Sequence, residues 1–204
     1  MRAMRCRCKA VVLAAALATV ACASRPPAPS PRVEKPTAWT SDAASGDVVL
    51  TASGYRFAAL QKGCERGEVH EFDASGDNVS VAYDCPSLLW LTIYVYANSY
   101  GGVPNPPDHF RGVVGDVLAA HAGATVERAV ELPLPLGTRT IPGFTAFLSW
   151  PEPKGEIGSF LMLIPDGARF VKVRVSFPLD GSDRPIEDAL LLADAVLRAV
   201  AKAP

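Results

Sequence analysis

The amino-acid sequence predicts a single α+β domain in which a mainly antiparallel β-sheet is flanked by two amphipathic helices. Short β-rich runs, several of them joined by turn-forming residues, predict strands that pair with their neighbours along the chain. Two segments, one mid-chain and one C-terminal, instead repeat apolar residues at helical spacing. The chain has 204 residues, 49% of them apolar, which is enough to bury one ordinary core.

Composition excludes several classes of protein. Lys and Arg number 20 against 21 Asp and Glu, so there is no basic excess of the kind that nucleic-acid binding requires. Only 5 cysteines and 8% aromatic residues are present, which excludes a disulfide-dense miniprotein and an aromatic base-stacking surface. We therefore expect no nucleic-acid partner.

The N-terminus has the features expected of an export signal. Residues 1–9 contain four cations and no acid, and the apolar run of residues 10–20 follows directly. This run is too short to cross a bilayer, which takes about 20 residues of helix. A basic segment, a short apolar run and small residues after it are typical of a secretory signal peptide, which we assign to residues 1–21.

Residues 18–22 (ATVAC) resemble the lipobox of bacterial envelope lipoproteins, with Thr19 in place of the usual Leu. The resemblance implies that Cys22 becomes the mature N-terminus, carries acyl chains such as palmitate, and attaches the protein to a membrane. Ala23, rather than Asp, is similar to the pattern of lipoproteins sorted to the outer membrane, facing the periplasm. The alternative is ordinary cleavage after Ala23, which would release a soluble periplasmic protein beginning at Ser24.

Residues 22–46 are predicted to form a spacer. Five prolines lie between Pro26 and Pro36, and proline cannot donate the hydrogen bonds that helices and sheets need. Removing the four signal cations from 20 leaves 16 Lys and Arg against 21 acids, a net charge of −5. Charge would therefore not hold the mature protein on anionic lipid, and the lipid on Cys22 would supply the attachment. The domain is predicted to span residues 47–204.

The first predicted strands are residues 69–73 and 79–84, separated by a turn-forming cluster. With a turn centred near residues 75–76, Cys64 and Cys85 lie nearly opposite each other at the base of this hairpin. Export would place both in a compartment where disulfides persist, so we predict a Cys64–Cys85 disulfide; two unpaired buried thiols are the alternative.

Leu88–Tyr96 is predicted to be an interior strand, because both of its faces are largely apolar. One face carries Leu89, Leu91, Ile93 and Val95, and the other carries Trp90, Thr92, Tyr94 and Tyr96.

The first helix is predicted to begin after Asn105 or Asp108 and to stop at Gly123. We expect Gly112 and Gly115 inside it to allow close packing on the sheet. Its apolar positions are Phe110, Val113, Val114, Val117 and Leu118.

Four further strands are predicted at residues 126–132, 139–150, 159–164 and 170–177. The last of them alternates, which predicts an inner apolar face and a solvated outer face. Val171, Val173, Val175 and Phe177 form the inner face, and Lys172, Arg174 and Ser176 the outer one.

The terminal helix is predicted to begin near Asp183, with Pro185 in its first turn. Its apolar stripe consists of Ile186, Leu190, Ala193, Leu197 and Val200. This order of strands, helix, strands and helix resembles the Mog1p/PsbP-like sandwich over roughly residues 50–200. The resemblance lies in element order and implies a fold, not an activity.

No catalytic constellation is evident. His70, His109 and His121 have no second His, Cys or carboxylate at a recognised metal-ligand spacing, so we predict no metal, cofactor or catalytic residue. The sequence thus favours a membrane-tethered accessory or binding lipoprotein of the bacterial cell envelope. The alternatives are an envelope hydrolase with an unidentified active site and a structural subunit of an envelope assembly.

The candidate ligand-binding residues are Tyr94, Tyr96, Tyr100 and His109, which flank or belong to the irregular loop of residues 98–109. Long irregular loops often carry binding residues. The alternative is that Tyr94 and Tyr96 pack beneath a helix. The expected partners are the membrane, through Cys22, and either envelope proteins or a small ligand.

Overall fold

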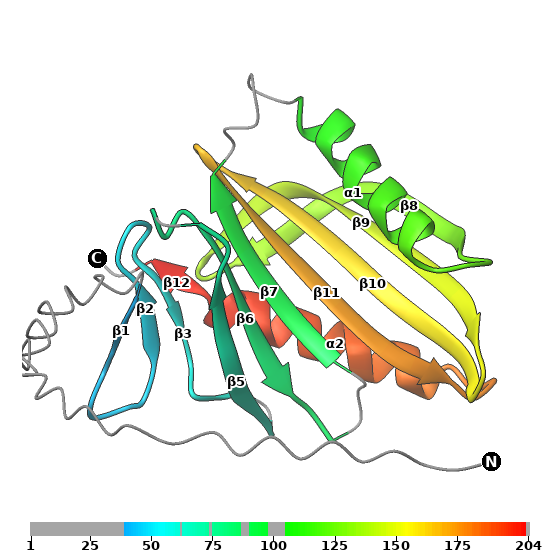
Figure 1. Ribbon diagram of the computed structural model, residues 1–204, viewed down its shortest axis with the longest axis horizontal. Coiled ribbons are helices and arrows are strands. Elements are labelled where there is room, and N and C mark those ends of the chain that lie inside the picture. Colours follow the sequence, from blue (N-terminus) through cyan, green and yellow to red (C-terminus); the bar gives the residue numbers. More distant parts are fainter. Residues whose placement is uncertain (1–38, 62, 74, 87–89, 98–104, 203–204) are drawn as a thin grey trace, which may run out of the picture. The chain divides into compact units, whose positions relative to one another are not determined.

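The computed structural model describes residues 39–61, 63–73, 75–86, 90–97 and 105–202, all of which belong to one compact unit, Pro36–Pro204 (Figure 1). Within these residues the strands form a large eight-stranded sheet and a small four-stranded sheet. All recorded strand pairs are antiparallel. The prediction of mainly antiparallel sheet with two helices is confirmed; the described residues are dominated by sheet, and a second, small sheet lies beside the large one.

The large sheet has the strand order β4-β5-β6-β7-β11-β10-β9-β8. The interior position predicted for residues 88–96 is confirmed for residues 90–96, because β7 pairs with β6 on one side and β11 on the other. Leu88 and Leu89 lie outside the described residues. The strands are β4 (Leu60–Gln61), β5 (Cys64–Glu71), β6 (Asn78–Asp84), β7 (Trp90–Ala97), β8 (Thr125–Leu136), β9 (Arg139–Glu152), β10 (Gly155–Asp166) and β11 (Arg169–Leu179).

The small sheet was not predicted. It consists of β1 (Trp39–Ser41), β2 (Val48–Leu50), β3 (Tyr55–Phe57) and β12 (Ala201–Lys202). These strands are two or three residues long, too short to show the period-two alternation by which strands are recognised. Because β1 pairs with β2, regular structure begins before residue 47, inside the segment predicted to be spacer.

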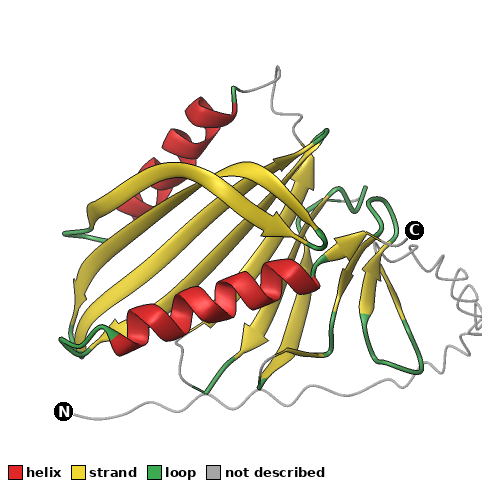
Figure 2. Ribbon diagram, turned by 180° about the vertical axis from the view of Figure 1, so that it is seen from behind, coloured by secondary structure: helices red, strands yellow, loops and turns green. Residues whose placement is uncertain are grey.

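The two helices, α1 (Pro106–Ala120) and α2 (Arg184–Ala199), pack on opposite faces of the large sheet (Figures 1 and 2). Apolar side chains of α1 join one buried cluster with Leu161 and Leu163 of β10. Side chains of α2 join the other cluster with Val173 and Val175 of β11. The buried residues are Phe110, Val113 and Val117 on α1, and Ala189, Leu192, Ala193, Val196 and Leu197 on α2.

Two expectations about the helices were wrong. A Cβ added at Gly112 or Gly115 would meet nothing within 4 Å, so these glycines do not permit close packing on the sheet. Leu190, predicted to be in the apolar stripe of the terminal helix, is 40% exposed. The buried face of α2 is instead centred on Ala189 and Ala193, and Leu190 lies at its edge. The N-cap of α1 is Asn105, one of the two predicted residues.

The prediction of a solvated face on the last strand was also wrong. Lys172 and Arg174 are partly buried, and Ser176 is fully buried with its hydroxyl 2.9 Å from that of Ser159. Alternation identified the correct face of β11, but α1 packs over this side of the sheet.

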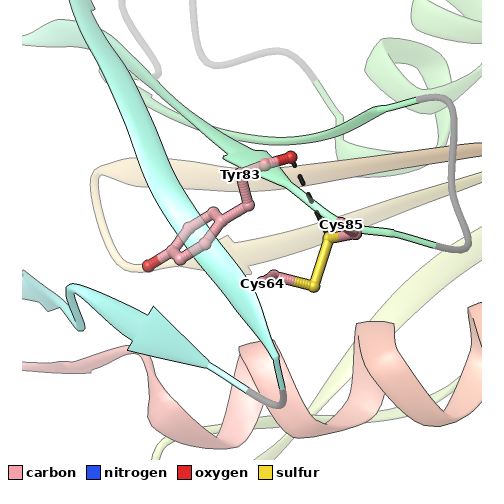
Figure 3. The surroundings of a disulfide bond; sticks show 3 residues. All are labelled: Cys64, Tyr83 and Cys85. Atoms are coloured by element: carbon pink, nitrogen blue, oxygen red, sulfur yellow. Dashed lines mark hydrogen bonds between the residues drawn. A yellow bond between two sulfur atoms is a disulfide. The ribbon is translucent and has the colours of Figure 1, made fainter.

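The predicted pairing of Cys64 with Cys85 is confirmed. The two residues form a disulfide, with their Cα atoms 4.3 Å apart, beside Tyr83 (Figure 3). Burial raises the pKa of Tyr83 to about 12, and its hydroxyl donates to the carbonyl of Ala58 at 2.9 Å. The bridge therefore lies in the packed base of the β5–β6 hairpin.

Candidate functional site

Two of the predicted ligand-binding residues contact each other on the α1 side of the large sheet. The hydroxyl of Tyr96, at the end of β7, lies 2.7 Å from Nε2 of His109 in the first turns of α1. The His109 ring also packs against Phe170, with centroids 4.4 Å apart. Burial, and then the nearby charge of Lys172, lower the pKa of His109, so the neutral imidazole is favoured.

Tyr94 belongs to a different contact. The ammonium of Lys172 lies 4.0 Å from the centre of the Tyr94 ring, within range of a cation–π interaction. Tyr94 also stacks with Phe72, which is exposed. Tyr100 lies outside the described residues. The predicted group therefore divides into a Tyr96–His109 pair and a Tyr94–Lys172 pair.

Tyr94 and Lys172 line a small pocket between α1 and strands β7, β10 and β11, which we call the α1 pocket. Its volume is about 120 Å³. The other polar residues lining it are Asp116 of α1 and Arg174 of β11. Its apolar residues are Val113, Val117, Ala120 and Leu161.

Arg174 is held in place by neutral groups. Its Nη2 donates to Nε2 of His121 at 2.9 Å, and its Nε lies 3.5 Å from the hydroxyl oxygen of Ser159. The guanidinium lies 5.5 Å from the ring of Trp150, against which the His121 ring stacks. Burial and the charge of Arg174 lower the pKa of His121, as expected for a histidine that accepts this bond in its neutral form.

The opposite face of the large sheet carries a larger pocket, between α2 and strands β8, β9 and β10. We call it the α2 groove; its volume is about 450 Å³. Figure 2 shows α2 lying across the sheet, with β8 and β9 curving over it. The lining is Arg128, Val130, Leu132, Pro133, Leu134, Pro135, Thr145, Phe147, Phe160, Met162, Leu190, Asp194 and Leu197.

The α2 groove is apolar apart from three residues. The hydroxyl of Thr145 is buried and has no hydrogen-bond partner in the described part of the chain. Asp194 is paired with Arg198 through bonds of 2.7 and 3.0 Å. Arg128 is exposed and makes no ion pair within 4.0 Å with any residue that the structure describes. The groove therefore offers apolar walls, one hydroxyl and one unpaired cation.

Sequence reasoning missed the α2 groove and assigned Lys172 and Arg174 to solvent. The sequence held no signal for the groove, because Leu190 fits the apolar stripe of the terminal helix and only the structure shows it 40% exposed. Among residues 39–202, outside the short gaps named above, no group of three or more His, Cys, Asp and Glu side chains could hold a metal ion. No helix in that part of the chain is long and apolar enough to span a membrane. Cys22 lies outside the described residues.

No known protein family and no curated protein matches this sequence. Among solved structures, the chain is similar to PA94 from Pseudomonas aeruginosa, a protein of unknown function, with a TM-score of 0.48 and 10% sequence identity. The match covers 69% of this chain and 98% of that one.

Proposed function

We propose that this protein is a lipid-anchored, periplasm-facing binding protein of the bacterial cell envelope, and that its α2 groove takes an apolar ligand with an acyl chain. The observation that carries the proposal is the groove itself. Its volume of about 450 Å³ lies within the range of small-molecule sites, about 300–1,000 Å³, and its lining is mostly apolar.

The chemistry of the groove favours an acyl chain over a purely polar ligand. Burying a methylene group contributes about 0.8 kcal/mol, so a chain that follows the apolar walls gains affinity along its length. Thr145 can donate its unpaired hydroxyl to an ester or carboxyl oxygen, and Arg128 can attract an anionic end. Leu190 is exposed beside these residues, as expected for an apolar side chain whose partner is a ligand.

The envelope location is part of the proposal. The basic and apolar N-terminal segments, the lipobox-like residues 18–22 and the proline-rich spacer support export and acylation of Cys22. The Cys64–Cys85 bridge agrees with an oxidising compartment. A central sheet flanked by two helices, as in the Mog1p/PsbP-like sandwich, would then be the scaffold that holds the groove.

The proposal is tested by placing a charge at the groove and, separately, beside it. Leu190 lines the groove, whereas its neighbour Leu191 is 70% exposed and is not part of the lining. The full-length protein, extracted in a bile-salt detergent without an acyl chain, is titrated with a fluorescent fatty acid. We expect Leu190→Arg to weaken binding at least about tenfold and Leu191→Arg to leave it unchanged.

Equal binding by both variants, or no saturable binding by the natural protein, would contradict an acyl-chain site in the groove. Turnover of acyl esters added to the same assay would favour the hydrolase instead. Failure to bind any acyl compound, together with recovery in a stable complex after cross-linking in intact cells, would favour the structural subunit.

A further inference from the structure

The α1 pocket holds two cations that form no ion pair with a carboxylate of the described residues. Lys172 and Arg174 are two positions apart on β11, so their side chains lie on the same face of the sheet. Neither makes an ion pair within 4.0 Å with a described residue. Asp116 lines the same pocket from α1, but its carboxylate is not within this distance of either cation.

Such an arrangement is unfavourable for the protein alone. Burial lowers the pKa of Lys172 and of Arg174, and the charge of Arg174 lowers the pKa of Lys172 further. The carboxylate of Asp116 acts in the opposite direction on Lys172 but offsets this lowering only in part. Cations that lose part of their hydration on folding are usually paired, because this loss costs free energy that an opposite charge can offset. An anion bound between these two side chains would supply the opposite charge that the described residues do not place in contact with them.

The surrounding contacts orient the two cations without neutralising them. Lys172 lies over the ring of Tyr94, and Arg174 is bonded to His121 and Ser159. Each of these neighbours is an aromatic ring, a neutral imidazole or a hydroxyl. Side chains fixed in this way are preorganised, so an incoming anion does not have to order them.

We propose that the α1 pocket is a binding site for a small oxyanion, a carboxylate or phosphate group, held between Lys172 and Arg174. Arg binds such groups through its planar fork of donors and Lys through a compact charge. The volume of about 120 Å³ is below the range for drug-sized ligands, so the pocket takes a free small anion or the charged end of a larger molecule.

The test compares two lysines. The full-length protein is titrated calorimetrically with inorganic phosphate, acetate and glycerol 3-phosphate, the last of which represents a phospholipid headgroup. We expect saturable binding of at least one of these anions, and a loss of affinity of at least about tenfold in Lys172→Met. Lys154→Met removes an exposed lysine in the turn between β9 and β10 and should leave the affinity unchanged. Lys172→Arg should retain binding.

Stability distinguishes a ligand site from a structural contact. If Lys172 serves the anion, Lys172→Met relieves a desolvated charge and should unfold at the same temperature as the natural protein or higher. If the only role of Lys172 is its contact with the Tyr94 ring, Lys172→Met should unfold at a lower temperature than the natural protein and bind anions with the same affinity. That result would overturn the proposal. Absence of saturable binding of all three anions by the natural protein also overturns it. Stronger binding of glycerol 3-phosphate than of phosphate would identify a headgroup as the ligand.

Discussion

The hydroxyl of Tyr55 donates a hydrogen bond to the buried carboxylate of Asp166, which lies 111 residues further along the chain. Arg139 holds the same carboxylate with two bonds of 2.9 and 3.0 Å. Tyr55 belongs to β3 of the small sheet, whereas Asp166 and Arg139 lie at adjoining ends of β10 and β9 in the large sheet. This contact therefore joins the two sheets.

Removing the Tyr55 hydroxyl should destabilise the protein. Hydrogen bonds to charged groups contribute about 1.5–3 kcal/mol, so we expect Tyr55→Phe to lower the free energy of unfolding by about that amount. Chemical denaturation of the two proteins measures the difference. Tyr94→Phe is the matched control, because no hydrogen bond of its hydroxyl is recorded among the described residues, and it should change stability by less. Equal free energies of unfolding for Tyr55→Phe and the natural protein would show that this bond between the two sheets does not stabilise the fold.

The same bond predicts a response to alkaline pH. Burial, and then the bond to Asp166, raise the pKa of Tyr55 well above the ordinary value for tyrosine. The folded state therefore favours the protonated phenol, which adds to the free energy of unfolding. This stabilisation is fully present below about pH 10, the pKa of an unfolded tyrosine. It declines as the pH rises above that value. Denaturation curves between pH 8 and 11 should show a steeper loss of stability for the natural protein than for Tyr55→Phe.

The disulfide depends on an irregularity in the hairpin. Near the turn, β5 and β6 pair with Val69 opposite Val81, but at the base Glu65 lies opposite Asp84. One extra residue of β5, in a bulge between Arg66 and Val69, produces this shift. Continuing the shifted register places Cys64 opposite Cys85, whereas the unshifted register would place Cys64 opposite Pro86.

Replacing both cysteines should therefore cost the stability that loop closure provides. The loop encloses about 20 residues, for which the chain-entropy account gives about 3 kcal/mol. We expect Cys64→Ala/Cys85→Ala to lose about this amount, and reductant to destabilise the natural protein but not the variant. Non-reducing mass spectrometry checks the bond directly. Two alkylatable thiols in the denatured natural protein would contradict it.

Three glycines with different surroundings provide a fourth prediction. Alanine at the exposed positions Gly112 and Gly115 of α1 meets no atom, so each substitution should raise stability by about 0.5–1 kcal/mol through helix propensity. At Gly143 the added Cβ would lie 2.8 Å from Leu134 and 3.0 Å from the carbonyl of Leu163. Gly143→Ala should lower stability by about 1–3 kcal/mol. Thermal unfolding of the three variants would test this: the two helix variants should unfold at a higher temperature than the natural protein, and Gly143→Ala at a lower one.

The membrane anchor is tested at Cys22. We expect the natural protein to fractionate with membranes and Cys22→Ala to give a soluble or uncleaved product, because only an acylated cysteine holds the chain on the lipid. Fractionation of cells and mass spectrometry of the mature N-terminus measure both properties. A mature N-terminus at Ser24, with equal solubility of the two forms, would indicate ordinary secretion.

The sequence by itself determined the long strands and both helices. Alternation and helical spacing are local properties, so β6, β7 and β11 could be located from consecutive residues, and so could α1 and α2. The Cys64–Cys85 disulfide could also be predicted from the sequence, because a hairpin turn sets which residues of its two strands lie opposite each other.

The tertiary structure decided what covers each face. Nothing local to Lys172 or Arg174 shows that α1, more than 50 residues earlier, packs over them, so alternation assigned both to solvent. The α2 groove is built from three strands and a helix. Leu190 lines it because the buried face of α2 is centred on Ala189 and Ala193, which leaves Leu190 at the edge of that face. The small sheet likewise exists through pairing of strands too short to be recognised alone, with Tyr55 joined to Asp166 across 111 residues. Contacts between residues far apart in the chain produce no periodic pattern in the sequence. The α1 pocket and the α2 groove are both formed by such contacts, so only the tertiary structure could locate them.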